Sequence, residues 1–247
     1  MADALHVPFV YEPAEGYNLV APFIDEAAWT TFWRQNEAPF VDKWIRSLPA
    51  GLGLDAGSGT GPYLPVILKA GHSSVAFDNS AEMRARYQLK YNSQFQNCPQ
   101  PDYRMGSLEA PLPFADQAFD WILCTRVLSH IDNLPELLAE FNRVLRPGGA
   151  CLISDVHPQH PYNHTGFTIY PDSIAFPDGY KINIQTNKHP VDALLKTSVD
   201  TGFAVSVLRE FDLTDLQQPP DPSMFKKLYA QPDRKIFYVL QLHKSNH

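Results

Sequence analysis

The chain has 247 residues, of which 44% are hydrophobic, and this size fits one large α/β domain with a buried core. The formal net charge of −7 argues against a nucleic-acid partner and against an anionic membrane surface, because both are negatively charged. Three cysteines without a CxxC pair indicate neither a disulfide framework nor a zinc site. With no signal peptide or membrane-spanning run in view, we expect a cytoplasmic protein that holds no metal.

The first predicted elements are a helical region and a regular alternation of strands and helices. Residues 25–48 have helical spacing and many aromatic side chains, and Pro49 ends this region. Apolar runs predict strands at 51–56, 74–78, 102–105, 119–124 and 150–156, and amphipathic runs predict helices at 63–70, 81–92 and 134–145. Such an alternation is typical of a parallel sheet covered by helices on both faces.

The alternation stops after the fifth strand. Prolines and scattered aromatic residues between 157 and 190 indicate an insertion of short strands and loops. A helix at 191–201 and strands at 204–211 and 235–243 follow. No linker divides the chain, so we predict a single α/β domain.

A glycine-rich turn joins the strand predicted at 51–56 to the helix predicted at 63–70. Its sequence, LGLDAGSGTG at 52–61, places Gly57, Gly59 and Gly61 at alternate positions, where glycine permits a sharp turn and the close approach of a ligand. The GxGxxG loop of dinucleotide sites needs its third glycine one residue later, and the Gly-Lys-Ser/Thr end of a P-loop is absent. Asp78 ends the second strand, where a carboxylate can bind both ribose hydroxyls. A nucleoside site without a pyrophosphate is predicted, and a tight turn without ligand is the alternative.

Five sequence blocks, in this order, resemble class I S-adenosylmethionine-dependent methyltransferases, in particular the small-molecule and ubiquinone-biosynthesis subgroup. They are DAGSGTG at 55–61 (like DxGxGxG), FDNSAEM at 77–83 (like GxDxSxxM), GSLEAPLPF at 106–114 (like GDAExLPF), the segment 119–130 (like FDxVxxxxVLxH) and EFNRVLRPGG at 140–149 (like ExxRVLKPGG). Weaker similarity continues to the TGF of 201–203, so the resemblance covers nearly the whole chain.

The resemblance implies a Rossmann-like methyltransferase fold with a mostly parallel seven-stranded sheet. The corresponding division of the single domain 1–247 is a helical cap at 1–49, a cofactor-binding core at 50–156, a substrate-side insertion at 157–190 and a C-terminal part at 191–247 that completes the sheet.

The resemblance also implies S-adenosylmethionine as cofactor and S-adenosylhomocysteine as product. The residues expected to contact the cofactor are Asp55, Gly57, Gly59, Gly61, Asp78, Asn79, Met83, Ser107, Leu108, Thr125 and Arg126. Ser107 stands where the family usually has an aspartate that accepts a hydrogen bond from the adenine amino group. A hydroxyl accepts without charge assistance, so we expect a weaker bond there.

Methyl transfer from a sulfonium is an in-line displacement that needs positioning and, for some acceptors, a base. His130 and His157 follow the fourth and fifth strands and are the candidate bases; a structural cap is the alternative for His130. Substrate contacts are expected from Tyr17, Trp33, His157, Tyr162 and Tyr170, which lie in the N-terminal region and the insertion.

The predicted activity is methyl transfer to N or O of a small metabolite, natural product or short peptide. A methyltransferase-like fold that binds a ligand or a partner protein without turnover is the alternative, because Ser107 departs from the family and no base is compelling. The glycine spacing disfavours a nicotinamide oxidoreductase. The acidic composition disfavours a nucleic-acid methyltransferase, as does CTRV at 124–127 in place of the Asn/Asp-Pro-Pro-Tyr tetrad that acts on exocyclic amines.

Overall fold

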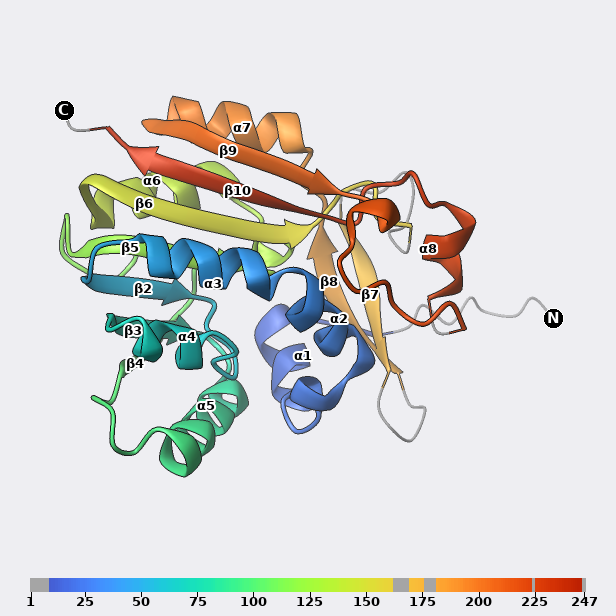
Figure 1. The fold of residues 1–247 in the computed structure, drawn as a ribbon, viewed down its shortest axis with the longest axis horizontal. Coiled ribbons are helices and arrows are strands. Elements are labelled where there is room, and N and C mark those ends of the chain that lie inside the picture. The colour runs from blue at the N-terminus through green and yellow to red at the C-terminus, as the bar shows by residue number, and fades with distance from the viewer. Residues whose placement is uncertain (1–8, 162–168, 176–180, 224, 246–247) are drawn as a thin grey trace.

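The computed structural model describes residues 9–161, 169–175, 181–223 and 225–245 (Figure 1). The larger of its two sheets has seven strands: β2 (Leu52–Ala56), β3 (Ser73–Asp78), β4 (Asp102–Met105), β5 (Phe119–Thr125), β6 (Leu145–Val156), β9 (Phe203–Phe211) and β10 (Phe237–Lys244). Their order is β4-β3-β2-β5-β6-β10-β9. The first five of these are parallel and β10 is antiparallel to both neighbours. The predicted mostly parallel, seven-stranded sheet is confirmed.

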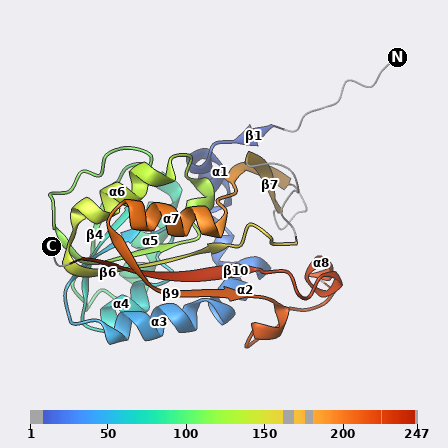
Figure 2. The ribbon, with the colours of Figure 1, turned by 90° about the horizontal axis from the view of Figure 1, so that it is seen from above.

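Helices cover both faces of this sheet. Figure 2 shows α6 (Leu134–Val144) and α7 (Val191–Asp200) on one side, and α3 (Ala38–Ser47) and α4 (Leu64–Lys69) on the other. Each side has its own apolar cluster. The first joins side chains of α6 and α7 to the sheet, and the second joins the aromatic N-terminal helices to the opposite face. Because both faces are buried, the central strands read as continuous apolar runs.

Local sequence explains where several elements begin. In α5 (Ala81–Gln94), Ser80 is the N-cap, and its Oγ accepts a hydrogen bond from the backbone N–H of Met83 at 3.1 Å. The strand predicted from 150 begins earlier, at Leu145, where it pairs with Phe119 before the register shifts. The Pro-Gly-Gly sequence therefore lies inside β6, in an irregular stretch of the strand.

The predicted helical region at 25–48 is divided. It consists of the 3₁₀ turn η1 (Ile24–Glu26), α2 (Ala28–Asn36) and α3, and Glu37 lies between the two helices. Pro39 sits in the first turn of α3, where its missing N–H costs nothing, and it favours a new helix start there. A further helix, α1 (Pro13–Val20), precedes this region and was not predicted as a separate element.

A second sheet joins the N-terminal segment to the insertion. Its order is β1 (Val10–Tyr11), β8 (Lys181–Asn187) and β7 (Ile169–Ala175), with β1 parallel to β8. Gly16 of α1 lies against Ile184 of β8, and a Cβ added there would be 2.5 Å from Cγ1 of Ile184. The predicted short strands of the insertion thus hold the N-terminal segment in place.

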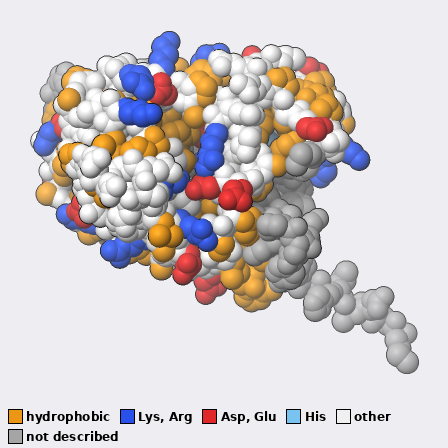
Figure 3. Space-filling view, turned by 60° about the horizontal axis from the view of Figure 1, so that its bottom comes forward, with side chains coloured by type: hydrophobic (Ala, Val, Ile, Leu, Met, Phe, Trp, Pro, Cys, Tyr) orange, Lys and Arg blue, Asp and Glu red, His pale blue; other side chains and the backbone are white. Residues whose placement is uncertain are grey.

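Three short helical elements complete the described chain. These are η2 (Leu128–His130), η3 (Leu213–Asp215) and α8 (Lys226–Ala230). On the face seen in Figure 3, acidic and basic side chains are interspersed with hydrophobic ones. Within the described ranges, no helix has the length and apolar character needed to cross a membrane.

Candidate functional site

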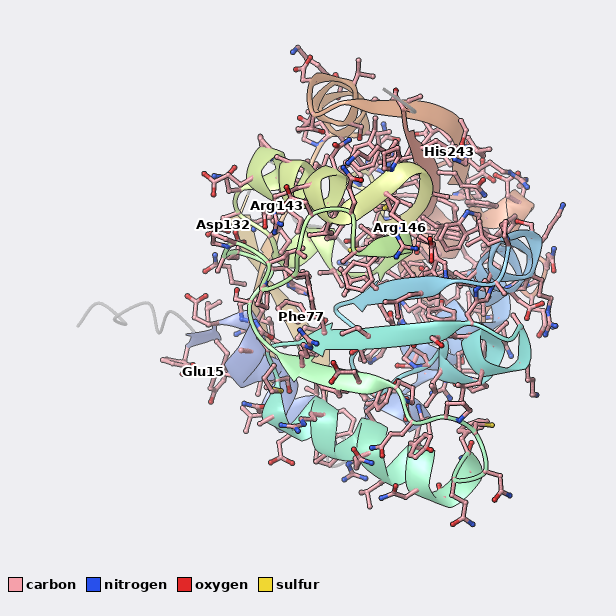
Figure 4. The ribbon with its side chains drawn as sticks, turned by 90° about the vertical axis from the view of Figure 1, so that its left-hand side faces the viewer. Glu15, Phe77, Asp132, Arg143, Arg146 and His243 are labelled. Atoms are coloured by element: carbon pink, nitrogen blue, oxygen red, sulfur yellow. The ribbon has the colours of Figure 1, made fainter. Side chains whose placement is uncertain are left out.

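A cavity of about 300 Å³ lies at the carboxyl ends of β2, β3 and β5, beneath α1 and beside β8. Ligands of open α/β sheets bind at this edge. Figure 4 shows the edge in profile: Phe77 lies near the end of β3, with Glu15 and Asp132 on the side to which the strand points. The lining residues come from the cap (Glu12–Ala14, Tyr17, Ile24, Asp25, Trp29, Thr30), from the glycine loop and the segments after β3 and β4 (Gly57–Thr60, Pro62, Asp78, Asn79, Met83, Gly106–Glu109) and from the segment after β5 and from β8 (Thr125–Val127, His130–Asp132, Gln185).

The glycine loop forms one wall. Gly57 has φ of +72°, and its N–H donates to the carbonyl of Phe77 at 2.8 Å. A Cβ on Gly57 would lie 2.2 Å from Cγ2 of Val127, so only glycine permits β5 to end this close to the loop. The loop is thereby fixed between the ends of two strands.

Asp78 is held at the end of β3 by two backbone groups. The N–H of Gly59 donates to its Oδ2 at 2.8 Å, and the N–H of Ser80 donates to its Oδ1 at 2.9 Å. Burial raises the pKa of Asp78, while these two hydrogen bonds oppose that shift. A carboxylate oriented in this way can still accept hydrogen bonds from a vicinal diol that enters the cavity.

Two of the predicted cofactor residues do not line the cavity. Asp55 is 4% exposed and lies under the loop, where burial and the nearby Asp78 raise its pKa to about 7. Gly61 has φ of +71° and faces Tyr87 of α5, 2.5 Å from where its Cβ would be. Both residues support the loop, so the direct cofactor contacts predicted for them are not supported. The other predicted cofactor residues do line the cavity.

Ser107 shows how the departure from the family pattern is accommodated. Its Oγ accepts a hydrogen bond from the backbone N–H of Glu109 at 3.1 Å. Glu109 in turn accepts from the backbone N–H of Asp132. The hydroxyl is therefore partly occupied within its own turn.

His130 and Tyr17 meet inside the cavity. The Tyr17 hydroxyl lies 2.9 Å from Nε2 of His130, and Nδ1 of His130 lies 3.0 Å from the backbone carbonyl of Gln185. A carbonyl only accepts, so Nδ1 carries the proton, and in the neutral imidazole Nε2 accepts from Tyr17. Three segments of the chain thus orient one imidazole.

His157 does not reach the cavity. It is 3% exposed, its Nε2 lies 2.8 Å from Oε1 of Glu210 on β9, and its Nδ1 accepts from the N–H of Gln159. Burial lowers the pKa of His157. The imidazole is turned toward β9, so the structure does not support the predicted catalytic and substrate-binding roles.

Of the other residues predicted to contact the substrate, some line the cavity and some do not. Tyr17 lines the cavity, whereas Trp33 is 6% exposed and packs edge-to-face on Phe237 in the core, so Trp33 is corrected to a core residue. Tyr162 lies outside the described residues. The backbone of Tyr170 belongs to β7, and its side chain lies outside what the structure describes.

Several cavity residues carry no local sequence signal. Thr30 lies within an aromatic helix, and Gln185 lies within a strand of the insertion. Glu37, which is buried and contacts Arg126 behind the cavity, follows three polar residues in the sequence, so nothing local indicates its burial. Only their approach to distant segments makes them part of the site.

Comparisons with known proteins agree with this geometry. A family model described as "Methyltransferase domain" matches residues 54–153, from β2 through β6. A 37.1 kDa transposon protein of Streptomyces fradiae is 29% identical over 190 residues, which cover 74% of this chain and 52% of that protein. The demethylmenaquinone methyltransferase of Chlorobaculum parvum is 30% identical over 141 residues, 56% of this chain and 55% of the relative. The chain therefore spans about half the length of these relatives.

A solved structure matches more of the chain. The S-adenosylmethionine-dependent methyltransferase from Mesorhizobium loti superposes with a TM-score of 0.63 over 90% of this chain and 100% of its own, at 19% identity. The matched family segment contains the glycine loop, Asp78 and the strand ends that form the cavity. Residues 54–153 therefore match a methyltransferase domain, and the chain has the fold of a solved S-adenosylmethionine-dependent methyltransferase. The resemblance predicted from the sequence blocks is confirmed.

S-adenosylmethionine is the cofactor expected from the match to a methyltransferase domain, and the residues of the cavity fit it. Asp78 is placed to accept hydrogen bonds from the ribose hydroxyls, and Met83 and Leu108 provide apolar walls for the adenine ring. Three buried polar atoms among the lining residues make no hydrogen bond within the described chain: Oγ1 of Thr30, Oγ of Ser58 and Nε of Arg126, the last of which faces Oε2 of Glu37 at 3.5 Å. Buried polar groups are normally satisfied, so these atoms indicate a polar ligand.

Proposed function

We propose that this methyltransferase transfers the methyl group of S-adenosylmethionine to N or O of a small metabolite, natural product or short peptide. The observation that carries the proposal is the joint position of the Asp78 ribose site and the Tyr17–His130 pair along one cavity. The demethylmenaquinone methyltransferase among the relatives supports a small-molecule acceptor. The net charge of −7 supports the exclusion of nucleic acid.

The bound cofactor would supply an activated methyl group on a sulfonium. The chain's part is then to orient and to exclude water. Asp78 and the glycine loop fix the nucleoside, and α1 with Ile24 and Trp29 covers the cavity from the cap side. The acceptor would enter beside Tyr17 and His130.

An acceptor O–H or N–H needs a route for its proton. In the described geometry Tyr17 donates to Nε2 of His130, so the phenol oxygen can accept a proton from the acceptor as its own proton passes to the imidazole. The Gln185 carbonyl bonded to Nδ1 stabilises the imidazolium that results. His130 would act as base through Tyr17 in this scheme.

The first test is calorimetric titration of S-adenosylmethionine and S-adenosylhomocysteine into the wild type and Asp78→Asn. We expect both ligands to bind and the variant to bind each about tenfold to a hundredfold more weakly, because hydrogen bonds to a charged carboxylate are lost. The exposed Asp102→Asn is the matched control. If neither ligand binds the wild type, the proposal is overturned.

The second candidate is the same fold acting as a binding protein. Ser107, whose hydroxyl is already engaged by Glu109, is the observation that favours it. Formation of S-adenosylhomocysteine during incubation with metabolite extracts separates the two. Cofactor binding without any turnover would favour the binding protein.

A further inference from the structure

Arg126 occupies an unusual backbone position at the end of β5. Its φ is +56°, a left-handed conformation that few residues other than glycine adopt. The backbone N–H of Arg126 donates to the carbonyl of Ser154 at 2.7 Å, which fixes this turn to β6. Strained residues of this kind concentrate at functional sites, and Arg126 lines the cavity.

The guanidinium of Arg126 is held by a buried acid. Its Nε lies 3.5 Å from Oε2 of Glu37, whose side chain is fully buried and also accepts hydrogen bonds from the hydroxyls of Tyr63 and Ser154. The guanidinium carbon lies 6.0 Å from the centre of the Trp33 ring. Burial is the largest single influence and works against the charged form, but Glu37 together with Tyr63, Tyr17 and Asp155 outweighs it and raises the pKa of Arg126. Arg126 is therefore a permanent cation at the cavity wall.

The hydrogen-bonding capacity of this cation is unused. Across the described chain, the side chain of Arg126 makes no hydrogen bond, and the contact of its buried Nε with Glu37 is an ion pair at 3.5 Å. Oγ1 of Thr30, on α2 one turn before Trp33, is buried without a partner, and Thr30 is 3% exposed. Both residues line the same cavity. With Nε turned toward Glu37, the Nη groups of the guanidinium and the Thr30 hydroxyl are left as donors that match the oxygens of a planar anion.

The charged residues that line the cavity indicate which anion Arg126 binds. Among the described residues that line the cavity, Arg126 is the only lysine or arginine, whereas five residues contribute carboxylates: Glu12, Asp25, Asp78, Glu109 and Asp132. The cofactor brings one carboxylate of its own into this cavity, at the far end of its amino-acid chain. A carboxylate placed away from Arg126 would meet a wall of like charge.

We propose that Arg126, assisted by Thr30, binds the amino-acid carboxylate of S-adenosylmethionine. Glu37 holds the guanidinium in place from behind. This inference rests on the proposed function, since it requires the cofactor to bind. An acceptor carboxylate offers the same chemistry to Arg126, and the experiment separates the two sources.

The test compares S-adenosylmethionine with decarboxylated S-adenosylmethionine, which lacks only the carboxylate. Calorimetric affinities are measured for the wild type, Arg126→Gln and Thr30→Val. We expect the wild type to prefer the carboxylate-bearing ligand by about tenfold or more, because a charge-assisted pair is lost with the analogue. Arg126→Gln should abolish this preference while its affinity for the analogue stays within about twofold, and Thr30→Val should reduce the preference by about threefold.

Two controls keep the result interpretable. Arg146→Gln removes an exposed arginine that pairs with Asp120 outside the cavity, and it should leave both affinities unchanged (Figure 4). If Arg126→Gln fails to fold because Glu37 is left buried without its cation, the double variant Glu37→Gln/Arg126→Gln removes both charges, and Thr30→Val tests the site independently.

Equal affinity of the wild type for the two ligands would overturn this inference while leaving the proposed function intact. So would an equal loss of both affinities in Arg126→Gln. If the variant binds both ligands as the wild type does, Arg126 does not contact the cofactor carboxylate, and its guanidinium is open to an acceptor acid. Failure of both ligands to bind the wild type would instead count against the proposed function.

Discussion

Individual side chains in the cavity are oriented by groups from other strands and helices. His130 is the clearest case, because the Tyr17 hydroxyl and the Gln185 carbonyl occupy its two ring nitrogens. Asp78 is oriented by the N–H groups of Gly59 and Ser80. Residues held from two sides in this way have little freedom, and such preorganisation is what positioning chemistry requires.

Replacing His130 tests the proposed proton route. We expect His130→Gln to lower kcat by about a hundredfold or more, because the proton of Tyr17 loses its acceptor base, while the affinity for S-adenosylmethionine changes by less than about twofold. Steady-state rates and calorimetry measure the two quantities. Tyr17→Phe should likewise lower kcat while leaving the affinity for S-adenosylmethionine nearly unchanged. An unchanged kcat in both variants would assign His130 to a structural cap.

The raised pKa of the buried Asp55 predicts that the stability of the protein depends on pH. Its pKa rises from 3.8 to about 7 on folding, so the folded protein binds this proton more tightly than the unfolded chain does. The free energy of unfolding of the ligand-free protein should therefore fall as pH rises from about 4 to about 7. Asp55→Asn removes this contribution. Its stability relative to wild type should increase by up to about 1.4 kcal/mol per pH unit across that window.

Urea unfolding at several pH values measures this difference, with the exposed Asp102→Asn as control. A difference between Asp55→Asn and wild type that stays constant from pH 4 to pH 7 would contradict the raised pKa.

At the scale of elements, α1 is attached to the core at several points. Its Asn18 Oδ1 accepts from the Ser80 hydroxyl and from the N–H of Glu82, so it also satisfies the first turn of α5. Gly16 permits α1 to lie directly on Ile184 of β8. The N-terminal segment and the insertion therefore form one cover over the cavity.

Gly16→Ala should loosen this cover. The new Cβ would lie 2.5 Å from the buried Ile184 side chain, so α1 must shift even though alanine favours a helix. We expect the affinity for S-adenosylmethionine to fall about threefold to tenfold, because α1 carries Tyr17. The double variant Gly16→Ala/Ile184→Ala should recover most of the loss. No recovery would show that Gly16 acts through something other than this contact.

At the scale of the whole molecule, the cap, the core and the C-terminal strands share one apolar cluster. It contains Phe32 and Trp33 from the cap, Trp121 and Leu152 from the central sheet, and Phe237 from β10. Regions that share a buried core unfold together. The chain should thus behave as one cooperative unit.

We predict a single thermal transition, with coincident curves from circular dichroism and tryptophan fluorescence. S-adenosylmethionine at a hundred times its Kd should add about 2.7 kcal/mol to the free energy of unfolding. Two separated transitions, of which only one responds to the ligand, would divide the chain into independent units and contradict the prediction.

Sequence patterns predicted the central sheet well because they are local. Alternating apolar strands and amphipathic helices and the glycine loop depend on near neighbours. The division of the N-terminal helical region was missed, although Pro39 marks it. The pairing of β1 with β8 had no sequence signal, because it joins Val10 to Asn183.

The sequence by itself determined the sheet, the resemblance to methyltransferases and the positions of the glycine loop and Asp78, since turn chemistry and hydrophobic period are written within short segments. Only the tertiary structure decided which side chains face the cavity. It turned His157 toward Glu210, placed Trp33 in the core, and brought Tyr17 to His130 from 113 residues away. A side chain's direction at a strand end depends on what packs against it, and those partners come from distant parts of the chain.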